Sequence, residues 1–140
     1  MPDNTPNTVH RIAQRAYQIG GCYLFSGSRT KASTHFYGRV SMGGRRVRVH
    51  RAVYEAANGP IAPGLTVDHL CGNTLCVNPF HLEAVSSREN TMRGVGPSAI
   101  NARKTHCKRG HELSGQNLLP PRNGWRECRK CDYARNRGLI

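Results

Sequence analysis

The chain has 140 residues, enough for one modest domain but few for a core that is stable without cross-links. Hydrophobic residues make up 37%, and 15 Gly and 8 Pro indicate that loops and turns take a large share. Lys and Arg outnumber Asp and Glu by 21 to 8 along the whole chain, so we expect a polyanionic partner. No apolar run approaches the roughly 18 residues of a membrane span, which predicts a soluble, cytoplasmic protein without a membrane partner.

The N-terminal segment, 1–20, is predicted to be an arm with a short helix. Residues 1–8 are polar, contain two prolines and are expected to be disordered. The run HRIAQRAYQIGG that follows predicts a helix closed by glycine.

A β-hairpin is predicted next, because Gly43-Gly44 joins two runs with the composition of strands. Alternation in the second run places Val47 and Val49 on one face. The other face then carries Arg46, Arg48 and His50. We expect a hairpin with an apolar back and a cationic front.

The elements after the hairpin are predicted from apolar runs and helix-stop residues. RAVYEAANGP indicates a helix ending at Asn58 and Gly59. LTVDHL and LEAVS indicate two strands around the loop CGNTLCVNPFH, and a helix is expected from about Ser87 to Arg93. We predict a core over 21–95, a linker over 96–106 and a second unit over 107–140.

The second unit contains a strong zinc signal. Six cysteines could form three disulfides in a secreted chain, but here they fall in close pairs mixed with histidines. Thiolate and imidazole in this mixture are the ligands of closed tetrahedral zinc sites. We predict a structural Cys₃His zinc site from Cys107, His111, Cys128 and Cys131, with a hairpin turn at Asn123-Gly124 between the two ligand pairs.

A first zinc site is predicted in the loop between the two strands. Cys71, Cys76 and His81 supply three ligands and leave the tetrahedron one short. Cys22 is the remaining cysteine and the candidate for the fourth position. The alternative is that Cys22 is a small buried apolar residue.

The run VDHLCGNTLCVNPFHLEAVSSREN resembles the ββα-metal motif of HNH endonucleases. Its loop HLCGNTLCVNPFHL is similar to that of His-Cys box homing endonucleases, and the preceding VHRAVYEAANGPIAPG is similar to the same segment of phage HNH proteins. The resemblance covers nearly everything after about residue 20. It implies a small, zinc-stabilised α+β fold with antiparallel strands, and a nuclease that acts on double-stranded DNA.

The resemblance also implies the roles of three residues. His69, at the end of the first strand, matches the general base that activates water. Asn90 matches a metal ligand, and Asp68 matches the acidic residue that is a second ligand in many members. Both offer oxygen, which suits Mg²⁺ or Mn²⁺. The alternative for His69 is a structural histidine or the missing zinc ligand.

The middle position of the HNH pattern departs from zinc-free members. His81 stands where their asparagine orients the base, but Cys71 and Cys76 make it a zinc ligand. The base then needs another orienting group, and the resemblance suggests a backbone carbonyl near Cys76. Asn78, before Pro79, is better interpreted as a turn residue.

DNA contacts are predicted mainly on the hairpin, because two antiparallel strands fit the major groove. The candidates are Arg39, Arg46, Arg48, His50 and Arg51, of which His50 or Arg51 is a candidate clamp for the scissile phosphate. One motif cuts one strand, so a double-strand cutter of this size is expected to be a symmetric homodimer. A homing, restriction or phage role stays open, and the alternative is a zinc-dependent DNA-binding regulator without catalysis.

Overall fold

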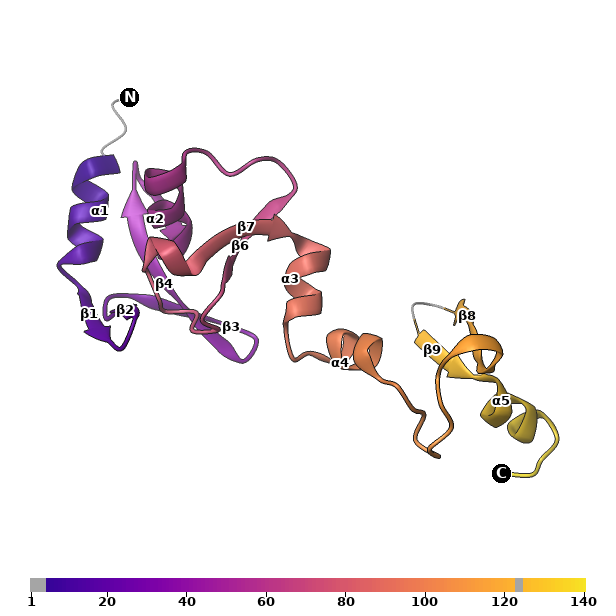
Figure 1. The fold of residues 1–140 in the computed structure, drawn as a ribbon. Helices are drawn as coiled ribbons and strands as arrows, with labels where there is room; N and C mark the ends of the chain where they lie inside the picture. The colour runs from indigo at the N-terminus through magenta and orange to yellow at the C-terminus, as the bar shows by residue number, and fades with distance from the viewer. Residues whose placement is uncertain (1–4, 123–124) are drawn as a thin grey trace. The chain divides into compact units, whose positions relative to one another are not determined.

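The computed structural model describes residues 5–122 and 125–140 (Figure 1). The chain divides into two compact units, residues 1–87 and 88–140. Within the described residues it contains antiparallel sheets of two or three strands and five α-helices. The predicted α+β class is confirmed.

The first unit begins with helix α1 (Thr5–Ala13) and a hairpin of β1 (Ala16–Ile19) and β2 (Cys22–Phe25). The predicted helix over 10–21 was therefore wrong in its extent. It starts inside the expected arm, and the glycine assigned to its end, Gly20 at φ 56°, lies in the hairpin turn. The expected disorder of residues 1–4 lies outside the described residues.

A three-stranded sheet follows, made of β3 (Arg29–Ala32), β4 (His35–Met42) and β5 (Arg45–Arg48). The predicted turn is confirmed: Gly43 and Gly44 have φ of 55° and 76°, as a two-residue hairpin turn requires.

Helix α2 (Val49–Asn58) begins directly after β5, two residues earlier than predicted. Val49 and His50 were expected in the strand and are helical instead. Both are buried, because the helix turns them towards the interior of the unit rather than along the alternating faces of the hairpin. The exposed cationic front of the hairpin therefore does not include His50.

The predicted strand, loop, strand and helix are confirmed as β6 (Leu65–His69), β7 (Leu82–Ser86) and α3 (Ser87–Arg93). The loop between the strands ends in the short 3₁₀ helix η1 (Pro79–His81). In the β6–β7 pair, Asp68 lies opposite Glu83 and His69 opposite Leu82. The α3 segment follows β7 without a break.

One apolar core holds the first unit together. It is built from Ile12 of α1, Phe25 of β2, Val67 of β6, Val77, Leu82, and the α2 residues Val49, Ala52 and Val53. The core joins the two helices to the loop between β6 and β7, residues 70–81, which we call the zinc loop after its predicted ligands. It therefore fixes the elements that present Asp68 and His69.

The second unit contains α4 (Pro97–Arg103), the 3₁₀ helix η2 (Gly115–Asn117), the hairpin β8 (Leu118–Arg122) and β9 (Trp125–Cys128), and α5 (Arg129–Asn136). The predicted hairpin is confirmed, while its turn at 123–124 lies outside the described residues.

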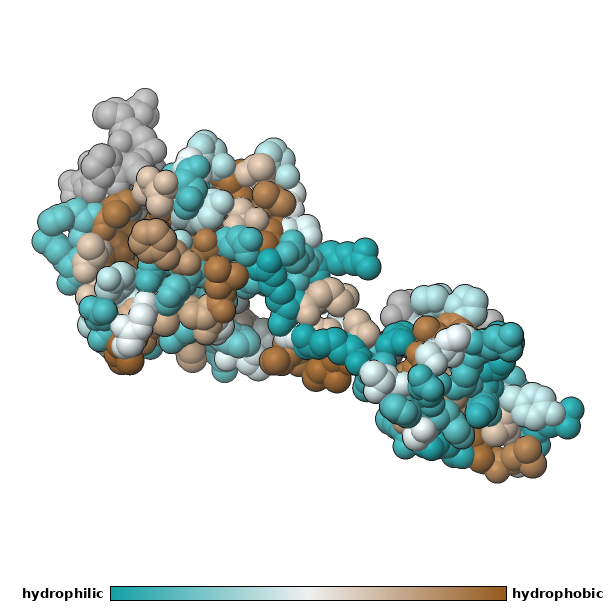
Figure 2. Space-filling view, in the orientation of Figure 1, coloured by the Kyte–Doolittle hydropathy of each residue, from teal (hydrophilic) through white to brown (hydrophobic). Residues whose placement is uncertain are grey.

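The segment 96–106, which was expected to be a linker, contains helix α4. Pro97 is its first residue, where proline is well tolerated, and Ala99 is fully buried. Hydrophilic residues cover most of the visible face of this unit (Figure 2). None of the helices in the described residues has the length and apolar content to cross a membrane.

Candidate functional site

The first cluster joins Cys22 to the three ligands predicted in the loop. One ligand atom from each of Cys22, Cys71, Cys76 and His81 lies within 4.8 Å of all the others. The Cys22 and Cys76 sulfurs are each 3.6 Å from His81 Nδ1. Zinc bonds of about 2.0–2.3 Å in a tetrahedron separate such atoms by about 3.5–3.8 Å, so the cluster could hold zinc. His69 is not needed as a fourth ligand.

Backbone pairing brings Cys22 to this cluster. The loop lies against β2: Phe25 N donates to Leu75 O at 2.9 Å, and Val77 N donates to Tyr23 O at 2.7 Å. A β-bridge between Leu24 and Cys76 lies between these bonds. The first residue of β2 is thereby held beside the loop.

The thiols of the first cluster interact unfavourably when charged. Desolvation, followed by hydrogen bonds and charge from Cys71 and Cys76, raises the pKa of Cys22 to about 11. Three thiolates so close together need a cation to balance them. The chemistry of the donor set therefore fits a divalent metal.

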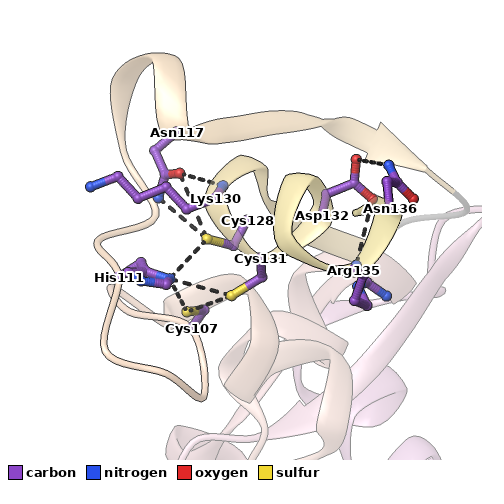
Figure 3. Close-up of polar contacts among 9 residues, drawn as sticks. All are labelled: Cys107, His111, Asn117, Cys128, Lys130, Cys131, Asp132, Arg135 and Asn136. Carbon is purple, nitrogen blue, oxygen red and sulfur yellow. Dashed lines mark hydrogen bonds and ion pairs between the residues drawn. The ribbon is translucent and has the colours of Figure 1, made fainter. Parts of the chain in front are cut away.

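The second cluster contains the four predicted ligands, with three sulfurs directed at the His111 ring (Figure 3). His111 Nδ1 lies 3.6 Å from the sulfurs of Cys107 and Cys128 and 3.3 Å from that of Cys131. The Cys107 and Cys131 sulfurs are 3.7 Å apart. All six cysteines are free, so the structure agrees with metal clusters rather than disulfides.

Asn117 supports the second cluster and was not identified from the sequence. Its Nδ2 donates to the Cys128 sulfur at 3.4 Å, and its Oδ1 accepts from Lys130 N at 3.1 Å (Figure 3). Burial raises the pKa of Cys128, but hydrogen bonds from the Cys131 backbone and from the side chains of Asn117, Cys131 and His111 together outweigh it, so the pKa is lowered. An asparagine without ligand spacing gives no signal in the sequence that could have revealed this role.

Asp68 and His69 are presented at the end of β6. The Asp68 carboxylate is half-buried and its Oδ1 accepts from His69 N at 2.7 Å. His69 is 8% exposed, and its imidazole interacts with the backbone of Cys76, which acts to raise its pKa. That is the contact that the resemblance suggested for orienting the imidazole. Asn90 lies on α3, in the second unit.

The Nε2 atom of His69 is buried and has no hydrogen-bond partner among the described residues. Buried polar atoms without a partner are uncommon in folded proteins and call for an explanation, of which a catalytic role is one. Burial lowers the pKa of His69 to about 4, although Asp68 and the Cys76 backbone act in the opposite direction. The imidazole is therefore neutral at pH 7, as a general base must be.

A second buried histidine lies against the first. The His50 and His69 rings meet edge to face with centroids 4.7 Å apart, and Tyr37 lies 5.7 Å from His50 and 6.4 Å from His69. Burial, followed by the neighbouring His69, lowers the pKa of His50 to about 3. The sequence pattern predicted His50 on the strand expected to contact DNA, and nothing in it indicated this ring pair.

The predicted hairpin arginines form a cationic strip. Cross-strand pairing places Arg39 opposite Arg48, and Ser41 opposite Arg46. The Arg48 guanidinium lies 4.7 Å from the centroid of the Tyr37 ring, and Arg51 is exposed on α2. The strip can attract an anionic backbone, and through Tyr37 it adjoins the histidine pair.

Asn78 ties the zinc loop to the β1–β2 hairpin. Its Nδ2 donates to Gly21 O at 2.8 Å and its Oδ1 accepts from Phe80 N at 3.1 Å at the start of η1. The interpretation of Asn78 as a turn residue is confirmed. It is buried, so both hydrogen bonds replace contacts with water.

Replacing Asn78 with alanine should lower the free energy of unfolding of the first unit by about 1–3 kcal/mol, because Gly21 O and Phe80 N lose their partner. Urea unfolding measures the difference. The matched control is Asn58→Ala, which removes a single exposed bond to Tyr54 O and should change stability far less. Equal losses in the two variants would show that the buried bonds of Asn78 contribute little.

Comparison with known proteins agrees with these observations. A family model described as HNH endonuclease matches residues 47–92. Protein 7.7 of Escherichia phage T7 is 38% identical over 55 residues, 39% of this chain and 42% of that protein. The uncharacterized gene 5.3 protein of Enterobacteria phage T3 is 35% identical over 79 residues, 52% of this chain and 76% of that protein.

Protein 2.8 of Escherichia phage T7 is 31% identical over 101 residues, 71% of this chain and 62% of that protein. The matched part of this chain thus spans less than half of Protein 7.7 and less than two thirds of Protein 2.8. No solved structure matches the chain significantly.

Proposed function

Because the chain belongs to the HNH endonuclease family, we propose that it is a metal-dependent enzyme that hydrolyses phosphodiester bonds in double-stranded DNA. The observation that carries the proposal is the buried Nε2 of His69, which has no partner among the described residues while the rest of the imidazole is fixed. A neutral ring nitrogen that no protein group occupies can take a proton from a water molecule that reaches it.

His69 acts as the general base in this proposal. Because Nε2 has no partner among the described residues while the ring interacts with the Cys76 backbone, Nε2 is the nitrogen proposed to accept the proton. The Asp68 carboxylate holds the backbone N–H of His69, which fixes the end of β6. His50 limits the rotation of the base by edge-to-face contact with its ring.

Asp68 and Asn90 are proposed to hold one Mg²⁺ or Mn²⁺ ion. The role of Asn90 rests on its match to the family motif, and both residues offer the oxygen atoms that hard cations prefer. When bound, such an ion stabilises negative charge on the phosphate and the leaving oxygen. Two structural Zn²⁺ ions are proposed for the Cys/His clusters.

The remaining predictions concern DNA and assembly. Arg39, Arg46, Arg48 and Arg51 are proposed to contact DNA, with His50 or Arg51 near the scissile phosphate. We also propose that cutting is sequence-specific and that a homodimer makes double-strand breaks. The protein is proposed to act in the cytoplasm of a phage-infected host. The phage relatives support the last of these, although their names state no activity.

The test is cleavage of supercoiled plasmid and phage genomic DNA by the zinc-loaded protein. We expect nicked or linear products after Mg²⁺ or Mn²⁺ is added, and none with the zinc-loaded protein alone. Discrete fragments of phage DNA would indicate sequence specificity. Tight binding without cutting in either metal would contradict the nuclease and favour the DNA-binding regulator.

A further inference from the structure

A small cavity of the first unit gathers arginines from two distant parts of the chain. Its volume is about 190 Å³. Arg11 and Arg15 come from α1 and the segment after it, while Arg39 and Arg46 come from β4 and β5. The rest of the wall is formed by Phe25, Ser28, Val40 and Ser41.

The positive charge of this arginine cavity is not balanced by the described residues. No carboxylate lines it, and within the described part of the chain none of the four arginines forms an ion pair. Glu55 lines a neighbouring cavity that shares Arg39 and Arg46, together with Arg48 and Arg51. Even in that neighbouring cavity, four arginines line the wall with one glutamate.

Arg39 is the residue that most clearly calls for a ligand. Its Nε is buried and has no hydrogen-bond partner among the described residues. Its neighbour across the sheet is Arg48, and like charges directly opposite each other destabilise a strand pair. An anion in the cavity would satisfy the Nε–H donor and offset the repulsion.

The backbone around the cavity is fixed. Arg15 O accepts hydrogen bonds from both the N and the Oγ of Ser26, each at 2.8 Å. Arg39 N donates to Ser28 O at 2.7 Å. The arginines therefore extend from anchored positions, which lowers the entropic cost of gathering them around one ligand.

We propose that the arginine cavity binds a backbone phosphate of double-stranded DNA away from the phosphodiester bond that is cleaved. A phosphate accepts paired N–H donors from guanidinium groups, and neither Asp68 nor His69 lines the cavity. The inference rests on the proposed function in one respect, that DNA is the ligand. Arg11 and Arg15 thereby join the hairpin arginines as DNA-contacting residues.

The test measures the affinity of the zinc-loaded protein for a fluorescent DNA duplex over a range of salt concentrations, without Mg²⁺ or Mn²⁺. We expect Arg39→Gln and Arg15→Gln each to weaken binding several-fold. Each should also flatten the plot of log affinity against log salt by about one unit, the contribution of roughly one phosphate contact. Arg15 is exposed, so its variant should fold even if Arg39→Gln is destabilised.

The matched control is Arg45→Gln, which removes the same charge from β5 at an exposed residue outside the cavity. Two results would overturn the proposal. One is a salt slope that falls by the same amount in Arg45→Gln, and the other is a salt slope that falls in neither Arg39→Gln nor Arg15→Gln. Thermal melting of the protein in inorganic phosphate distinguishes the two sources of a phosphate ligand, which are the DNA backbone and free phosphate. An Arg39-dependent stabilisation by phosphate, with an unchanged DNA slope, would identify a site for free phosphate and also overturn it.

These measurements are independent of cleavage. A protein that binds DNA through the cavity but does not cut would leave this inference standing and contradict the nuclease. A protein that cuts DNA, but whose cavity variants keep the salt slope unchanged, would support the nuclease and contradict this inference.

Discussion

Replacing His69 with alanine is expected to reduce metal-dependent DNA cleavage by about 100- to 10,000-fold, the usual contribution of a positioned general base. DNA affinity should remain close to that of the unmodified protein, because burial lowers the pKa of His69 to about 4 and the imidazole lost at pH 7 carries no charge. Cleavage is measured by the rate of plasmid nicking in Mg²⁺, and affinity by duplex binding without Mg²⁺. The two readouts separate chemistry from binding.

The matched control is His35→Ala, which removes an exposed imidazole from β4. Its cleavage rate should stay within about twofold of that of the unmodified protein, as for a surface substitution that changes little. Because His69 is buried against His50, a thermal melt of the His69 variant is needed to show that it is folded. A folded His69→Ala protein that cuts at the full rate would refute the assignment of the base.

Replacing Cys76 with serine is expected to remove one zinc ion and unfold the first unit. Cys76 is fully buried, and its segment pairs with β2 through the bridge to Leu24. Structural zinc contributes about 10–16 kcal/mol of apparent binding free energy in small peptides at pH 7. That is as large as the whole stability of a typical domain, about 5–15 kcal/mol.

Zinc content by elemental mass spectrometry should fall from two ions per chain to one, with loss of the melting transition of the first unit. Cys128→Ser is the mirror control, because it should remove the other ion and affect the second unit instead. Retention of two zinc ions and of both transitions in Cys76→Ser would show that the first cluster is not a structural metal site.

Local spacing made much of this protein predictable from its sequence. Gly43-Gly44 determines the β4–β5 turn, because few other residues adopt positive φ twice in succession. The close spacing of Cys71, Cys76 and His81 fits one metal whatever the surrounding fold. The order of strand, zinc loop, strand and helix also followed from the sequence, and with it the resemblance that assigned a role to His69.

Other features of the fold could not be predicted from local sequence patterns. Helix α2 begins at Val49, which is buried in the core, and a four-residue alternation cannot reveal burial against distant elements. The segment Ala16–Ile19 forms a strand because it pairs with β2, whereas its composition alone also allowed the end of a helix.

The sequence by itself determined the ligand types, the hairpin turn and the motif order, because each depends on residues close together in the chain. Only the tertiary structure decided that Cys22 completes the first cluster, through pairing of β2 with the zinc loop. It also decided that His50 lies against His69 and that Arg11 and Arg15 meet Arg39. Contacts of this kind depend on how the core packs α1, α2 and the strands together, and sequence spacing carries no record of that packing.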